Sequence, residues 1–287
     1  RLVKMDLILE LEDKYFFDWM YSKVSPNYLA QNASDPVRQF ISIYLTLTVH
    51  GWLLYFSGAG LSWLLFFDKK YLEHPKKLHN QVAREISTTF FSIPVMSVFT
   101  SPIFWLEVNG YSKLLDSSPG WQFELSTIFS FLVFTDFCIY WIHRWLHHPL
   151  IYPHVHKTHH LWKVPTPWAS HAFHPLDGFL QSTPYHIYVF LFPMNKILYL
   201  GMFIFVNMWT ISIHDGWFLS FDGVINSSAH HAEHHLHFTC NYGQYFTFWD
   251  RMFGSHRYPD HESLNPLNAI EKKNDAIRRS QKTDKAG

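Results

Sequence analysis

The chain has 287 residues, enough for one large domain, and nothing in it indicates a second one. Its 23 basic and 23 acidic residues balance to a formal net charge of zero, which excludes a nucleic-acid-binding protein that relies on its overall field. Aromatic residues make up 19% and charged residues only 16%, a ratio that indicates a membrane-embedded chain. Two cysteines support neither a disulfide framework nor a thiolate cluster.

Residues 1–40 form a polar N-terminal segment. The stretch is charged throughout and lacks the apolar core of a cleavable signal peptide, so we expect internal segments to target the chain. Met5 is a candidate natural start, with Arg1–Lys4 upstream of it.

Long apolar stretches follow, and each is long enough for a membrane helix at about 1.5 Å per residue. They cover about 41–67, 86–106 and 123–142, together with a proline-interrupted hairpin over 179–213. Residues 41–67 contain no Asp, Glu, Lys or Arg at all. The sequence therefore predicts an all-α fold, a multi-pass transmembrane helical bundle, within a single membrane-embedded domain over 41–254.

Lysine and arginine predict the orientation of this bundle. The connection 68–85 carries five of them, whereas 107–120 carries one, so the first connection is expected in the cytosol. Residues 143–178 and 214–254 then form a cytosolic, histidine-rich helical cap. We expect the charged tail, 255–287, to be cytosolic and disordered.

Histidine is strongly concentrated, since 15 of the 21 histidines lie between His143 and His235. Three clusters carry most of them: His143, His147 and His148; His156, His159 and His160; and His231, His234 and His235. On a helix, positions i, i+3 and i+4 share one face, so the second and third clusters each present three imidazoles together. In the first cluster His147 shares the face of His143, and His148 lies about 140° round the helix.

These imidazoles predict a dinuclear metal site in the cap. Imidazole is a common ligand of iron, zinc and copper, and eight or more converging rings are too many for one ion. Without a metal, so many polar nitrogens would lack partners beside a membrane. His174 and His214, outside the clusters, are further candidate ligands.

Other residues are candidates for holding the ligands in place. They are Asp136, His171, Asp215, His230 and Glu233. Asp136 lies two helical turns before His143 on the same predicted face, where its carboxylate could accept the second N–H of a ligating histidine. An Asp hydrated near the membrane surface is an equal alternative. His171 stays open as a ligand, a supporting residue or part of a substrate pocket.

The pattern His-x3-His-His, His-x2-His-His and His-x2-His-His after apolar spans resembles the membrane fatty acid hydroxylase and sterol desaturase superfamily. The intervening segments are similar to those of its sterol C5-desaturases: 109–114 (NGYSKL), 139–144 (IYWIHR), 170–175 (SHAFHP), 209–216 (WTISIHDG) and 241–246 (NYGQYF). Related hydroxylases leave four residues between their first pair, which favours His143 with His148 and leaves His147 unbound.

The resemblance implies the removal of two hydrogens from C5 and C6 of a Δ7-sterol, converting lathosterol into 7-dehydrocholesterol. It further implies two iron ions, with zinc as a substitute in purified samples, and O2 as the oxidant. Electrons would come from NAD(P)H through cytochrome b5 and its reductase, in the endoplasmic reticulum membrane. The sterol would enter from the bilayer.

Two other interpretations remain. A 4-methylsterol oxidase or a fatty-acyl hydroxylase could use the same scaffold, and product analysis separates these reactions. A histidine-rich membrane metal transporter belongs to another class, but it would place its ligands within the spans, whereas these clusters flank them.

Overall fold

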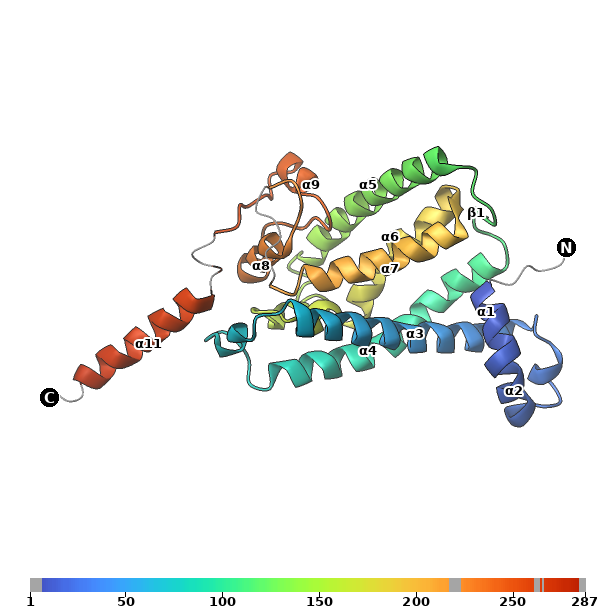
Figure 1. The fold of residues 1–287 in the computed structure, drawn as a ribbon, viewed down its shortest axis with the longest axis horizontal. Coiled ribbons are helices and arrows are strands. Elements are labelled where there is room, and N and C mark those ends of the chain that lie inside the picture. Colours follow the sequence, from blue (N-terminus) through green and yellow to red (C-terminus); the bar gives the residue numbers. More distant parts are fainter. Residues whose placement is uncertain (1–6, 217–222, 261–263, 265, 284–287) are drawn as a thin grey trace.

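The computed structural model describes residues 7–216, 223–260, 264 and 266–283, and these are mostly helical (Figure 1). The α-helices are α1 (Leu7–Glu12), α2 (Asp18–Val24), α3 (Pro36–Leu65), α4 (Gln81–Val108), α5 (Trp121–Leu146), α6 (Pro175–Leu191), α7 (Lys196–Ser212), α8 (Ser228–His237), α9 (Phe248–Met252) and α11 (Pro266–Thr283). Shorter helical turns are η1 (Asp13–Phe17), η2 (Leu29–Gln31), η3 (Lys69–Glu73), η4 (His159–Leu161) and η5 (Pro167–His171). The strands β1 (Leu114–Leu115) and β2 (Met194–Asn195) pair in parallel.

Helices α3, α4 and α5 are long and apolar enough to cross a membrane, with 30, 28 and 26 residues. Only 22%, 33% and 33% of their most apolar windows are buried inside the protein. Large side chains such as Leu64, Phe91 and Phe129 are exposed on them. An apolar surface of this extent is stable against lipid rather than water. The prediction of an all-α membrane bundle is therefore confirmed.

Local chemistry explains where α3 begins and how α4 tolerates proline. Asp35 caps α3 by accepting hydrogen bonds from the backbone N–H groups of Val37 (2.9 Å) and Arg38 (3.2 Å). In α4, Pro94 has no N–H to donate to the carbonyl of Phe90 four residues earlier. The indole of Trp52 in α3 donates to that carbonyl instead, at 3.1 Å. The Phe90 carbonyl, which Pro94 leaves without a partner inside α4, therefore links α4 to α3.

Helices α6 and α7 form the predicted hairpin, and β2 lies at its turn. Each helix has 17 residues. At about 1.5 Å per residue this is about 26 Å, less than a hydrocarbon core of about 30 Å. Asn195 starts α7 by accepting from the N–H groups of Ile197 (2.9 Å) and Leu198 (3.1 Å).

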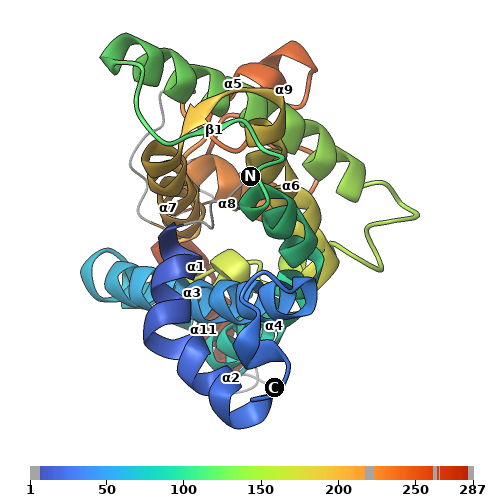
Figure 2. The same cartoon turned by 90° about the vertical axis from the view of Figure 1, so that its right-hand side faces the viewer.

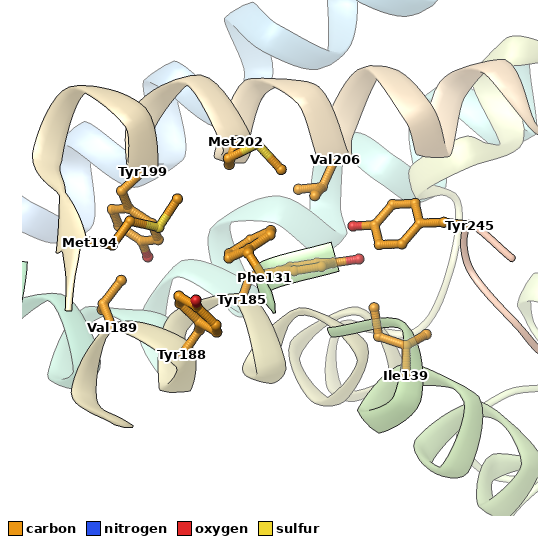
Figure 3. Packing of buried hydrophobic residues seen from close by; sticks show 10 residues of the cluster. All are labelled: Phe131, Ile139, Tyr185, Tyr188, Val189, Met194, Tyr199, Met202, Val206 and Tyr245. Carbon is orange, nitrogen blue, oxygen red and sulfur yellow. The ribbon is translucent and has the colours of Figure 1, made fainter. Parts of the chain in front are cut away.

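A buried aromatic cluster joins α5, α6 and α7 (Figure 3). Phe131 of α5 packs against Tyr185 and Tyr188 of α6, with ring centroids 6.2 and 5.1 Å apart. Val206 of α7 and Tyr245, from the segment after α8, belong to the same cluster. Tyr245 therefore anchors the histidine-rich part of the chain on the membrane helices.

The two ends of the bundle differ (Figure 1 and Figure 2). Helices α8 and α9 lie at one end of the long helices, and α1, α2 and β1 lie at the other. Tyr71 and His74, from the connection between α3 and α4, surround a small cavity together with His214 and Ser228. The basic connection and the histidine-rich segments therefore share one end of the bundle.

Both terminal segments contain helices. The N-terminal segment is helical and buries Leu9, Phe17 and Tyr21 in a cluster with residues of α3 and α4. The tail that we expected to be disordered contains α11, Pro266–Thr283. Its alanines, lysines and glutamate favour a helix, and this propensity opposes the disorder that low hydrophobicity suggested. Arg1–Lys4 lies outside the described residues.

Candidate metal centre

Nine histidine side chains gather in two groups at the end of the bundle that holds α8. The first group is His143, His147, His156, His160 and His234, and the second group is His159, His214, His231 and His235. Within each group, the nitrogens available for ligation all lie within 4.8 Å of one another. Two neighbouring groups of this size can hold two metal ions.

The two histidine triplets each contribute to both groups. His156 and His160 belong to the first group, and His159 between them belongs to the second. In α8 the division is reversed, because His231 and His235 belong to the second group and His234 to the first. In α8, residues four apart lie closer in direction than either does to the third residue, so His231 and His235 face one group. His156 lies instead in a turn that leads into η4, and this non-α-helical segment, where the sequence predicted a helix, divides its rings in the same way. Each triplet therefore joins both groups.

Several rings are fixed in orientation by a hydrogen bond from Nδ1. The acceptors are the backbone carbonyls of Tyr242 for His143 (3.0 Å), Cys240 for His234 (2.7 Å) and Thr210 for His214 (2.7 Å), and the carboxylate of Asp177 for His156 (2.7 Å). Carbonyl and carboxylate oxygens only accept hydrogen bonds, so Nδ1 carries the proton and Nε2 presents a lone pair. This is the tautomer that a metal requires when it binds Nε2.

The Nε2 atoms converge at separations that suit a shared ion. His160 Nε2 lies 3.1 Å from the Nε2 atoms of both His156 and His234. Two nitrogens about 2.1 Å from one ion, at right angles, are about 3 Å apart. His143 Nε2 is buried and has no hydrogen-bond partner among the described residues. Lone pairs that face each other repel unless a cation lies between them, so the donor set fits a metal site.

Burial keeps these rings neutral. Desolvation, followed by repulsion from neighbouring rings, holds the pKa values of His160, His231 and His235 well below the ordinary value. The same burial lowers the pKa of His214 to about 4. Neutral imidazole is the form that binds a metal, so the site is ready for ligation at neutral pH.

A cavity of about 170 Å³ begins at the second group and extends between the helices. His159, His214 and His231 line it, together with His143 of the first group. Most of the rest of its wall comes from α3, α4, α6 and α7, with contributions from α5, from η5 and from the segment after α8. This wall is largely apolar, with Leu47, Ile93, Phe104, Phe173 and Phe203 among the lining residues. An apolar molecule drawn from the membrane would lie in this cavity beside the candidate metal ligands.

Comparison with known proteins agrees with this arrangement. Residues 128–255 match the fatty acid hydroxylase family. Lathosterol oxidase of Rattus norvegicus is 50% identical over 263 residues, covering 89% of this chain and 86% of the relative. Lathosterol oxidase of Homo sapiens is 49% identical over 285 residues, covering 96% and 93%. A probable Δ7-sterol 5(6)-desaturase of Neurospora crassa is 45% identical over 298 residues, covering 89% and 87%.

The chain belongs to the family of lathosterol oxidases and Δ7-sterol 5(6)-desaturases. The family resemblance inferred from the histidine clusters is thereby confirmed. No solved structure matches the chain.

In this desaturase-family chain, two of the eleven predicted ligands lie outside both groups. His148 is exposed, and its Nδ1 accepts from the backbone N–H of Leu150 at 3.3 Å. His174 is also exposed and caps α6, its Nδ1 accepting from the N–H of Leu176 at 3.2 Å. The structure brings His147 into the first group, as the helical face suggested, and not His148.

Asp136 supports the first group indirectly. Among the described residues, Asp136 has no hydrogen bond to a ring of either group; its carboxylate accepts from the backbone N–H groups of Gln244 (2.9 Å) and Tyr245 (2.7 Å). It thereby fixes the loop in which the Tyr242 carbonyl holds His143. The carboxylate thus positions a ligand through the backbone.

Three further candidates are buried around the groups. Asp215 accepts from the hydroxyl of Ser62 at 3.4 Å. Glu233 forms an ion pair with Arg257 at 3.1 Å, which fastens the segment after α9 to α8. His230 lies on α8 outside both groups, with its ring 5.8 Å from that of His256.

His171 faces the cavity, where its Nε2 lies 3.1 Å from Oδ1 of Asn207. The sequence left His171 open as a ligand, a supporting residue or part of a substrate pocket, and its position in the cavity wall agrees with the third of these.

Asp177 was missed. It is fully buried and bonded to His156 at 2.7 Å, and Gln181 donates to its other oxygen at 2.7 Å. The residue lies three positions after His174, which the sequence analysis did consider. Asp177 lies in the first turn of α6, whereas the predicted hairpin began at residue 179, so its place on a helix was not available from the sequence.

Proposed function

We propose that this chain is a sterol C5(6)-desaturase, an oxidoreductase that converts lathosterol into 7-dehydrocholesterol in sterol biosynthesis. The relatives named as lathosterol oxidases and Δ7-sterol 5(6)-desaturases, at 45–50% identity over most of the chain, support this assignment. One structural observation carries it: the second histidine group forms part of the wall of an apolar cavity between membrane helices.

The reaction has a simple balance. The sterol loses one hydrogen from C5 and one from C6, O2 is reduced to two molecules of water, and NAD(P)H supplies the other two electrons. Ordinary acid or base side chains cannot break an unactivated C–H bond, because their useful pKa values lie near neutrality. Two iron ions, held by the first and the second group, would supply the redox chemistry.

The side chains of the protein have three tasks in this scheme. The acceptors Tyr242, Asp177, Cys240 and Thr210 orient the histidine rings and keep their Nε2 lone pairs toward the metal. Burial keeps the rings neutral and excludes water from the reacting carbon. The apolar wall positions the rigid sterol so that C5 and C6, rather than another carbon, face the second group.

We further propose that the protein lies in the endoplasmic reticulum membrane with both histidine groups toward the cytosol. Five basic residues in the connection 68–85 support this orientation, because that connection shares the end of the bundle with the groups. Cytochrome b5, with its reductase, would deliver electrons at this end.

The decisive experiment is sterol analysis of membranes that contain the chain, supplied with lathosterol, NADPH and O2, beside a His160→Ala control. We expect a 5,7-diene from the unaltered chain and none from the variant. A 4-methyl-oxidised sterol or a hydroxylated acyl chain would overturn the C5 assignment and leave the metal site in place. Metal analysis of the purified protein should give two ions per chain, as iron or as substituted zinc.

A further inference from the structure

Gln244 lies in the cavity wall beside both histidine groups. Two residues earlier, the carbonyl of Tyr242 accepts from His143 of the first group at 3.0 Å. The side chain of Gln244 donates a hydrogen bond to the hydroxyl of Thr210. The backbone carbonyl of Thr210 accepts from His214 of the second group at 2.7 Å. The side chain of Gln244 is therefore connected by short contacts to a ligand candidate in each group.

The amide of Gln244 has a defined orientation. The hydroxyl of Thr210 donates its proton to the carbonyl of Val206 at 2.8 Å, so its oxygen can only accept from Gln244. Gln244 donates through Nε2 at 3.1 Å, which directs Oε1 elsewhere. Among the residues that the structure describes, none donates to Oε1.

The backbone around this amide is fixed as well. The N–H of Gln244 donates to Asp136 at 2.9 Å, and its carbonyl accepts from the indole of Trp209 at 2.7 Å. The side chain thus offers a held acceptor, Oε1, and the second N–H of Nε2. An acceptor beside a donor is the pattern that binds a hydroxyl group, which both donates and accepts.

The other amide nearby is already committed. Asn207 lies on the same face of α7 as Thr210, one turn further from His214. Its Oδ1 accepts from His171 at 3.1 Å, and its Nδ2 donates to the carbonyl of Phe203 at 2.7 Å. Asn207 is therefore a matched amide in the same cavity whose acceptor has a partner.

Resting on the proposed function, we infer that Gln244 binds the 3-hydroxyl of the sterol, Oε1 accepting its proton and Nε2 donating to its oxygen. In a sterol, C3 and C5 are both bonded to C4. A sterol whose C5 faces the histidine groups therefore has its 3-hydroxyl next to them. Gln244, which lies beside His143 and His214, is a polar side chain at that position. The apolar side chain of the sterol then extends toward Phe104 and Phe203.

The test compares lathosterol with its 3-deoxy analogue in the unaltered chain, in Gln244→Leu and in the matched control Asn207→Leu. A bound sterol removes the Gln244 amide from water, and leaving that amide without its partner weakens binding by about 10- to 100-fold. The unaltered chain should therefore prefer lathosterol by about that factor. Gln244→Leu should reduce the preference to less than about threefold, and Asn207→Leu should keep it. The preference is measured both as a ratio of kcat/KM and as a ratio of Kd, by displacement of a fluorescent sterol.

A structural role of Gln244 would lower the values for both sterols equally and leave the preference intact, which would overturn the inference. Loss of the preference in Asn207→Leu but not in Gln244→Leu would also overturn it. The Kd ratios need no turnover. A chain that binds lathosterol but makes no 5,7-diene would therefore refute the proposed function, while the hydroxyl recognition is still decided.

Discussion

The two histidine groups are built from the same residue type but differ in their surroundings. In the first group, three of five rings donate from Nδ1 to an acceptor outside the group: His143, His156 and His234. In the second group, His214 makes such a bond among the described residues, and His235 has a backbone contact with Trp162. Nδ1 of His159 in the second group and of His160 in the first group is buried without a hydrogen-bond partner in the described part of the chain.

Contact with the cavity shows the opposite distribution. Three of the four rings of the second group line it, but only His143 of the first group does. We interpret the first group as the one held more rigidly and the second as the one that faces the substrate. A ring without an outer hydrogen bond can adjust its orientation, whereas a braced ring keeps its tautomer and position.

The largest expected effect separates two adjacent histidines. His147→Ala removes a member of the first group and should lower turnover by more than about 100-fold, because the braced first group loses one of its converging nitrogens. His148→Ala is the matched control, since this exposed ring lies outside both groups. Product formation and metal content should both be retained in the control. Equal losses in the two variants would contradict the assignment.

A smaller effect is expected from the brace alone. Asp177→Asn keeps the shape of the side chain but removes the charge that faces His156 Nδ1. We expect metal affinity at the first group to fall by about 10- to 100-fold, measured by competition with a chelator, while the second group is unaffected. Asp116→Asn, at an exposed ion pair with Lys196, is the control. Equal loss at both groups would mean that they are not braced separately.

Acid should destabilise the metal-free protein. Burial lowers the pKa of His214 from 6.5 to about 4, so between these values the unfolded chain binds a proton that the folded chain does not. The contribution of this residue to stability is therefore constant above pH 6.5 and becomes increasingly unfavourable as the pH falls toward 4. We expect Tm in detergent to be lower at pH 5 than at pH 7.5. Loaded metal should reduce the difference, and an unchanged Tm of the metal-free protein would argue against buried neutral rings.

The smallest effect concerns the cavity beside the second group. A Cβ at Gly178 would lie 2.1 Å from Phe173 Cε2 and 2.7 Å from Met96 Sδ, so Gly178→Ala forces these two lining residues to move. We expect KM for lathosterol to rise by about threefold to tenfold while metal content is unchanged. Gly201→Ala, where no atom lies within 4 Å of the added Cβ, should leave KM unaltered. A KM shift in both variants would indicate a general effect of alanine in these helices.

The sequence determined the features that depend on local spacing and composition. The length of the apolar segments predicted the membrane helices α3, α4 and α5, because the thickness of a membrane sets the length of a crossing segment. The periodicity of a helix indicated that His231, His234 and His235 would share one side of a helix, which α8 confirms, whereas the helix expected for His156–His160 is a turn followed by η4. The number of histidines implied two ions. The segments between the clusters were sufficient to indicate the family.

Tertiary structure decided what depends on contacts between distant residues. The division of each triplet between two groups could not be predicted, since it requires the turn at His156 and helix α8 to face each other. Asp177 reaches His156 across 21 residues, and Asp136 reaches Tyr245 across 109. Local periodicity fixes the direction of a side chain from its own helix. Only the packing of helices determines which partner it meets there.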